Sequence, residues 1–341
     1  MCWGLLWLLA GCGLSGNHYL LIDQSLVAHD PRQADAIMAQ AESEYGSRNR
    51  LLYSMDRGMT LHLAGEYVQS NSQLELAAQE VERLYTRTIR TETAAFLTND
   101  NMLPYEGDPY EHVMINIIKA LNYAAMGQLM EAVVEARQID HRLNVLSDAA
   151  KEKDGYREDA FARYLTGVLY EATGDLNNAF IAYRKAYDIY DATKSWARTP
   201  MPPMLRADLL RTTDALHMTT EFEEYRRLFP ETRWLPRADQ QNLAQVVVIG
   251  YNGRAPRKED AFLDIPISLS ALQLVLLNRG VIHASNRQER RVADSVLYGL
   301  NGRVVRVALP KLILQKTQVV HETVTLIPRG GEPVSATSEL V

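Results

Sequence analysis

The alternation of apolar and polar positions predicts helices through most of the first 235 residues. Apolar residues recur at intervals of three and four, as on one face of an α-helix, and Gly or Pro interrupts them at intervals. We expect helices over residues 33–45, 50–63, 67 to at least 82, within 109–150, and over 160–171 and 177–192, with a last pair ending near 229.

The clearest helix start in the sequence is Asp108-Pro109-Tyr110-Glu111. The Asp108 carboxylate can accept the first free amide protons, and Pro109 loses no hydrogen bond at the first helical position. Glu111, three residues after the cap, completes a capping box. We therefore expect a helix to begin at residue 109.

The pattern changes after about residue 240, where β-branched residues replace helix formers. The runs over 246–249, 303–307 and 319–327 predict strands. A tight turn over 329–332 would lead into a return strand from Val334.

The fold class predicted is mainly α with a C-terminal α+β part. We expect a helical domain over 31–235 and a β-rich module over 240–341, with short helices over 272–277 and 288–297. The sequence stops at Leu340-Val341 within an apolar pattern, so we expect the native protein to continue.

One register of small, glycine and large residues recurs three times in the helical part. The small residue would let two helices approach closely, and the glycine would end the first helix in a left-handed conformation. The register resembles the tetratricopeptide repeat. Its copies are Gly167, Tyr170, Gly174, Leu176, Ala179, Tyr183 and Ala186; Ala120, Tyr123, Gly127, Leu129, Ala132, Ala136 and Ile139; and Gly58, Leu61, Gly65, Tyr67, Ser70, Leu74 and Ala77.

The spacing of these copies is irregular. Gly65 and Gly127 are 62 residues apart, and Gly127 and Gly174 are 47 apart, both more than one repeat of about 34 residues. The sequence thus predicts three interrupted repeats, and an ordinary irregular helical bundle is the alternative.

The first residues have the pattern of a targeting segment. Residues 3–10 are almost entirely apolar, too few to cross a bilayer but enough for the centre of a signal peptide. The sequence Leu9-Ala10-Gly11-Cys12 resembles a bacterial lipobox. This resemblance implies removal of residues 1–11, lipidation of Cys12 and a tether over 13–30. The usual basic residue before the apolar run is missing, and a non-lipidated signal or a frayed terminus is the alternative.

Composition narrows the classes of function. The net charge of −6 gives no bulk attraction for nucleic acid. The two cysteines, Cys2 and Cys12, both precede the predicted domains, so these can hold neither a disulfide nor a cysteine-ligated zinc ion. No phosphate loop, dinucleotide signature or nucleophile elbow is present, the eight histidines lack metal-ligand spacing, and we expect no cofactor.

Two features could bind a partner. A loop over 250–258 gathers Arg254, Arg257 and Lys258 and could bind an anion or an acidic surface, or could simply close a strand. Tyrosines of the helical part would suit a peptide groove or the core: Tyr123, Tyr164, Tyr170, Tyr183 and Tyr187.

Several segments look like an uncharacterised family of bacterial envelope lipoproteins: 105–111, 119–123, 134–137, 162–167 and 253–258. The resemblance implies tetratricopeptide-like helices, a β-containing C-terminal part and other envelope lipoproteins as companions. It implies no reaction. The absence of Asp after Cys12 favours the outer membrane, facing the periplasm.

The function expected from the sequence is a membrane-anchored periplasmic adaptor that binds protein partners through helical repeats, and not an enzyme. The alternative is an enzyme acting on peptidoglycan, since two carboxylates suffice for glycan hydrolysis, or a module that binds glycan or lipid.

Overall fold

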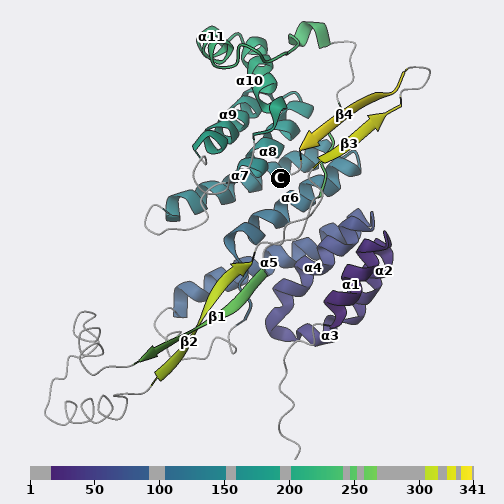
Figure 1. The fold of residues 1–341 in the computed structure, drawn as a ribbon, viewed down its shortest axis with the longest axis vertical. Helices are drawn as coiled ribbons and strands as arrows, with labels where there is room; N and C mark the ends of the chain where they lie inside the picture. The colour runs from purple at the N-terminus through teal and green to yellow at the C-terminus, as the bar shows by residue number, and fades with distance from the viewer. Residues whose placement is uncertain are drawn as a thin grey trace, which may run out of the picture. The chain divides into compact units, whose positions relative to one another are not determined.

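The protein is described from a computed structural model, which defines residues 17–91, 104–150, 159–192, 201–240, 246–251, 257–266, 304–313, 321–327 and 332–339. The chain divides into two compact units, Met1–Ala244 and Gln245–Val341. Figure 1 shows helices in the first unit and strands in the second. The predicted signal segment over 1–11 and Cys12 lie outside the described residues.

The helices predicted over residues 50–229 are confirmed, the one predicted over 33–45 is divided at Ala41, and α1 is an additional helix. The described helices are α1 (Asn17–Val27), α2 (Pro31–Gln40), α3 (Glu42–Tyr45), α4 (Arg50–Leu63), α5 (Tyr67–Thr91), α6 (Pro109–Ala125), α7 (Leu129–Ala150), α8 (Ala160–Ala172), α9 (Leu176–Ala192), α10 (Pro203–Ala215) and α11 (Thr219–Leu228), with short 3₁₀ turns at Ser47–Asn49 and Arg237–Gln240. The capping box of α6 is formed, because the Asp108 amide donates to Glu111 Oε2 over 2.6 Å.

The same turn joins the two helices of each predicted repeat. Gly65, Gly127 and Gly174 all have left-handed backbones, with φ of 77°, 74° and 83°. At the first of them, the Gly65 amide donates to the His62 carbonyl and the Glu66 amide to the Leu61 carbonyl. The turns at Gly127 and Gly174 repeat both bonds, so each glycine closes a helix hairpin as the sequence predicted.

Two further hairpins have histidine in the position of the glycine. His29 between α1 and α2 and His217 between α10 and α11 have φ of 58° and 55°, with the same pair of backbone bonds. The described residues therefore contain five hairpins rather than three. A search for glycine misses two of them, because histidine also adopts this backbone at a moderate cost.

The first of these hairpins corrects the predicted tether over 13–30. Residues 17–27 form α1, which packs on α2. Its buried residue Ile22 shares a core with Met38 and Tyr45. The sequence Leu20-Leu21-Ile22 next to polar residues obscured the helical period, and packing on the following helices supplies the stability.

Within each hairpin, a small residue of the first helix faces a residue of the second. A Cβ atom added at Gly167 would lie 2.4 Å from the Tyr183 ring, and one added at Gly58 would lie 2.5 Å from Leu74 Cδ2. In the middle hairpin, Ala120 and Ala136 are both fully buried. The predicted function of the small residues, close approach of the two helices, is thereby confirmed.

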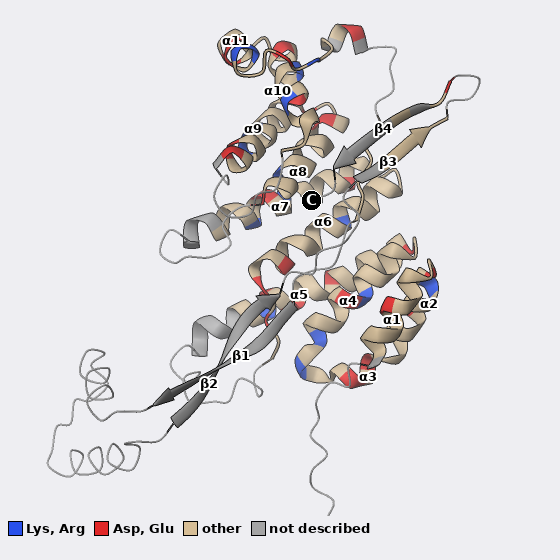
Figure 2. Ribbon diagram, viewed as in Figure 1, with Lys and Arg blue, Asp and Glu red and all other residues tan. Residues whose placement is uncertain are grey.

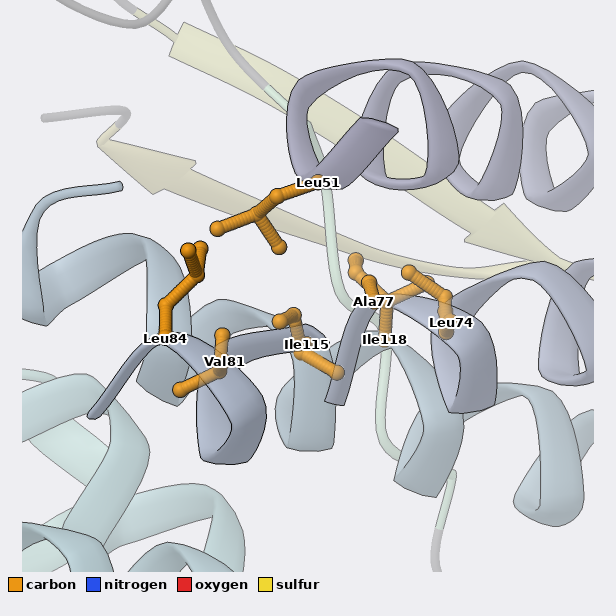
Figure 3. Packing of buried hydrophobic residues seen from close by; sticks show 7 residues of the cluster. All are labelled: Leu51, Leu74, Ala77, Val81, Leu84, Ile115 and Ile118. Carbon is orange, nitrogen blue, oxygen red and sulfur yellow. The ribbon is translucent and has the colours of Figure 1, made fainter. Parts of the chain in front are cut away.

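Successive hairpins pack on one another from α1 to α11. Figure 3 shows one of the cores between hairpins, where α4, α5 and α6 contribute side chains. Its buried members are Leu51, Leu74, Ala77, Val81, Leu84, Ile115 and Ile118. A unit that cannot bury its apolar face alone gains stability from its neighbours in this way, so the first unit is a tetratricopeptide-like array.

The second unit contains two antiparallel ladders. Strand β1 (Arg257–Pro266) pairs with β2 (Val304–Ile313), and β3 (His321–Leu326) pairs with β4 (Val334–Glu339). The predicted strands near 303–307 and 319–327 and the return strand from Val334 are confirmed. The expected strand over 246–249 is wrong, since these residues have no regular structure and Val246, Val247 and Val248 are half exposed. The helices expected over 272–277 and 288–297 lie outside the described residues.

The close approach at Gly167 can be tested by adding one methyl group. Gly167→Ala should lower the free energy of unfolding by about 1–3 kcal/mol, because the Tyr183 ring must move. Gly58→Ala should lower the free energy of unfolding by less than Gly167→Ala does, because the Leu74 side chain is flexible. Urea unfolding followed by circular dichroism measures both. An increase in stability at Gly167, as for an ordinary helical glycine, would contradict the predicted packing.

At the histidine turns, we expect a substitution by glycine to stabilise the protein, in contrast to the substitutions of Gly167 and Gly58. Replacing His217 by Gly should raise the free energy of unfolding by up to about 1 kcal/mol, because glycine adopts a positive φ without strain. His217 is exposed, so no packing is lost. Gly174→His is the reverse exchange in a neighbouring turn and should destabilise the same unfolding transition. If His217→Gly destabilised the protein, the turn would not depend on backbone strain.

Candidate functional site

Helices α2, α4 and α5 border an open cavity of about 590 Å³. Two arginines, two carboxylates and three neutral polar side chains line it over a small apolar floor. The cavity reaches solvent beside Arg32, whose side chain is 80% exposed. The lining residues are Arg32, Asp35, Arg57, Leu61, Ala64, Glu66, Gln69, Ser72 and Gln73.

Arg57 of α4 and Asp35 of α2 are the less exposed charges of the cavity. Arg57 Nη1 donates to the Tyr53 hydroxyl over 3.0 Å, and Arg57 Nε lies 3.7 Å from Asp35 Oδ1. That Nε is enclosed and makes no hydrogen bond within the described structure. Asp35 accepts a 3.3 Å bond from the Thr60 hydroxyl instead. Arg57 and Asp35 thus form an ion pair without a hydrogen bond at Nε.

The outer part of the cavity offers both donors and acceptors. The Gln69 side-chain amide donates to Glu66 Oε2 over 3.3 Å, and Glu66 lies 3.9 Å from Arg32 at the rim. Ser72 and Gln73 add further hydroxyl and amide groups. Paired charges and amides of this kind fit the backbone and polar side chains of a peptide better than an apolar molecule.

The repeat-signature residues are structural. Most are fully or nearly fully buried, and the glycines close the turns. Tyr67 at the start of α5 and Tyr123 near the end of α6 are partly exposed. The buried residues of the set are Gly58, Ala120, Ala132, Gly167, Tyr170, Ala179, Tyr183 and Ala186.

Of the tyrosines proposed for a peptide groove or the core, Tyr170 and Tyr183 are buried, whereas Tyr123, Tyr164 and Tyr187 are partly exposed. Tyr170 and Tyr183 are 4% and 1% exposed. The Tyr164 hydroxyl donates to Asp208 over 2.7 Å and the Tyr183 hydroxyl to Glu171 over 2.8 Å. Burial, reinforced by the charges of these carboxylates, raises the pKa of both tyrosines well above 10. Both phenols therefore stay neutral and hold α8, α9 and α10 together.

The predicted basic loop is only partly a loop. Arg257 and Lys258 begin β1, where they pair with Ile313 and Leu312 of β2. Extended pairing with a β-branched strand took precedence over the turn that Gly and Pro suggested. Arg254 lies outside the described residues. The joint binding site predicted for the three basic residues therefore stays a prediction.

A buried polar network between hairpins was missed by the sequence analysis. Asn122 of α6 is fully buried and donates from Nδ2 to Ser70 Oγ and Asn71 Oδ1 of α5. Its Oδ1 lies 2.6 Å from His62 Nδ1 of α4. The signal was present, because Asn116, Lys119 and Asn122 recur every third residue in an otherwise apolar helix.

Lys119 extends this network through ion pairs. Its Nζ lies 2.9 Å from both Glu75 and Glu135. Burial lowers the pKa of Lys119, but the hydrogen bonds and charges of the two carboxylates outweigh it and raise the pKa overall. The bond from Lys119 lowers the pKa of Glu75 in turn. The lysine therefore stays charged and joins α5, α6 and α7.

A second buried cation joins the next hairpins. Arg211 of α10 donates to Glu171 of α8 over 2.6 Å and to Asp208 over 2.7 Å. Burial acts against its charge, yet the two carboxylates raise its pKa overall. Burial also raises the pKa of Asp208, which Arg211 and Tyr164 only partly offset. This carboxylate pair is already bound to an internal cation, so it is not an open pair for acid–base chemistry.

Within the described part of the chain, no three His, Cys, Asp or Glu residues are placed to hold a metal ion. No helix of that part is both long and apolar enough to cross a bilayer. The site with the space and polarity to bind something is the cavity between α2, α4 and α5.

No model of a known protein family and no protein of curated function matches the chain. Solved structures do match. They include nearly identical TPR-like repeats attributed to a kinesin light chain of Podosopora anserina, with 16% identity, a TM-score of 0.42 and coverage of 69% of this chain and 100% of that one.

Two further matches have lower scores. The Rap conjugation gene regulator of the plasmid pLS20, in complex with the Phr* peptide, is 15% identical with a TM-score of 0.35, over 67% of this chain and 60% of its own. BtubC (BKLC) from P. vanneervenii is 14% identical with a TM-score of 0.34, and the match covers 69% of this chain and 86% of that one. The fold assignment of this chain rests on its own five hairpins.

The histidine in the buried network predicts a dependence of stability on pH. Burial lowers the pKa of His62 below 6.5, so the unfolded chain takes up a proton first as the pH falls. The stability that neutral His62 provides is therefore complete above about pH 6.5 and is lost below it. His62→Asn should keep a bond to Asn122 and weaken this loss.

Urea midpoints from about pH 7.5 to about pH 5.5 measure the effect. His217→Asn removes an exposed histidine and should leave the pH dependence unchanged. An equal dependence in wild type and His62→Asn would mean that other groups cause it.

Proposed function

We propose that this protein is a lipid-anchored adaptor of the bacterial cell envelope that holds protein partners on its helical repeats. The cavity between α2, α4 and α5 is the observation that carries the proposal. It presents paired charges and amides from three helices, on a scaffold where the buried groups Asn122, Lys119 and Arg211 are already bound to side chains of neighbouring helices.

The ligand of the cavity is an extended segment of a partner protein. Gln69 and Gln73 can bond with peptide groups, while Arg32 and Glu66 at the rim can pair with charged side chains. A volume of about 590 Å³ holds a few residues. The rest of the affinity would come from surfaces around it, as is usual for protein interfaces.

The location is supported by the sequence Leu9-Ala10-Gly11-Cys12 and by the resemblance to envelope lipoproteins. Acyl chains on Cys12 would hold the protein at the membrane, since each buried CH₂ contributes about 0.8 kcal/mol. Gly13 in place of Asp favours the outer membrane, with the repeats in the periplasm.

Site-specific photo-crosslinking tests the cavity. A photoreactive residue at Gln69 should form an adduct with a discrete partner in cells, and one at Gln138 on α7 should not. Both positions are exposed glutamines. Adding Arg32→Ala should reduce the Gln69 adduct, because the rim loses its charge, while unfolding stays unchanged. Equal adducts from both positions would argue against the cavity as the contact.

The anchor has a separate test. Cys12→Ser should abolish acylation, seen by mass spectrometry, and should move the protein from the membrane fraction to the soluble fraction. Cys2→Ser, within the segment to be removed, is the matched control and should change neither. Unchanged partition of the Cys12→Ser protein would refute the lipid anchor.

A further inference from the structure

The outward face of α1 is mainly apolar. Leu20, Leu21 and Val27 are 56%, 48% and 72% exposed, with the exposed Gln24 among them. Residues 20, 24 and 27 lie on successive turns of one side of the helix, and residue 21 is their neighbour. The only Asp, Glu, Lys or Arg in α1 is Asp23, which borders this face between Leu20 and Val27 and is half-buried.

The core fixes this orientation. Ile22 on the opposite side of α1 is buried with Ala34, Met38 and Tyr45. The Tyr19 hydroxyl donates to Asp56 of α4 over 2.9 Å, next to the Tyr45 hydroxyl at 2.8 Å from the same oxygen. Helix α1 therefore cannot rotate to bury Leu20 and Leu21 without losing these contacts.

The two terminal helices of the array differ in chemistry. Helix α11 exposes Glu223, Glu224, Arg226 and Arg227, as expected for a last repeat that must face water. Figure 2 shows acidic and basic positions on the α11 ribbon. Helix α1 is equally terminal but lacks such a polar face. Its apolar surface therefore indicates a covering other than water.

The short distance in sequence between Cys12 and α1 indicates what would cover the apolar face of α1. Asn17, the first residue of α1, is only five positions after Cys12 in the sequence. A chain of this length spans at most about 18 Å when fully extended. This step rests on the proposed function, because a lipid on Cys12 brings α1 to within that distance of the acyl chains.

We propose that α1 is a membrane-docking helix that lies in the lipid interface with Leu20, Leu21 and Val27 among the acyl chains. Interfacial helices bury their apolar face by about 5–10 Å in this way. The face has no basic residue, so the attraction is apolar and independent of anionic lipid. The lipid anchor then holds the protein at the membrane, and α1 sets the orientation of the first hairpin and its cavity relative to the bilayer.

Spin labelling of the acylated full chain tests the proposal. No cysteine follows Cys12, so Gln24→Cys introduces one label in the centre of the face, and Gln40→Cys on α2 is the exposed control. The protein is reconstituted in vesicles of phosphatidylethanolamine and phosphatidylglycerol. Collisions of each label with oxygen and with a water-soluble nickel chelate are then measured.

The expected result is that the label at 24 loses accessibility to nickel and retains oxygen collisions, while the label at 40 stays accessible to nickel. The added pair Leu20→Gln and Leu21→Gln should restore nickel access at 24, with unchanged helicity and acylation. The protection should persist in vesicles of phosphatidylethanolamine and phosphatidylcholine without anionic lipid.

Three results would overturn the proposal and separate it from the anchor. If the protein is acylated and vesicle-bound but both labels are equally accessible to nickel, the anchor stands and the docking helix fails. If mass spectrometry shows no lipid on Cys12, the anchor fails and the docking helix with it. Protection at 24 before vesicles are added, with dipolar broadening, would assign the face to a second copy of the chain.

Discussion

The array depends on one constraint, the sharp reversal between two helices that then lie in close contact. A residue with a left-handed backbone ends the first helix of each hairpin, and a small residue on that helix admits the second. Glycine meets the first requirement without strain at three turns, and histidine meets it at two. Every larger feature, including the cavity between α2, α4 and α5, follows from this geometry.

Between hairpins, polar side chains add specificity to apolar packing. Lys119 and Arg211 are buried cations with two carboxylate partners each, and Asn122 bonds to three side chains. Buried ion pairs of this kind contribute little net stability, yet removing one partner is costly. These groups therefore favour one register between neighbouring hairpins over others that an apolar core alone would allow.

The first two hairpins carry both proposed contact surfaces, one for a protein partner and one for the membrane. The cavity lies among α2, α4 and α5, while the apolar face belongs to the outward side of α1. The core around Met38 and Tyr45 connects them, because it holds α1 and α2 in a fixed relation. A membrane contact on α1 would thus orient the cavity without contributing to it.

The sequence by itself determined the helices over residues 50–229, the strands from 304 onward, the capping box at Asp108 and the three glycine turns, because these depend on local period and backbone preference. It missed α1, whose stability comes from packing on α2. It could not reveal the turns at His29 and His217, since histidine adopts that conformation only when the flanking helices pack. Tertiary structure alone decided that Tyr183 is core, that Arg257 and Lys258 begin a strand and that Arg32, Asp35 and Arg57 meet Gln69 in one cavity. Residues so far apart in the chain become neighbours only through the packing of α2 and α5 on α4, which no local pattern encodes.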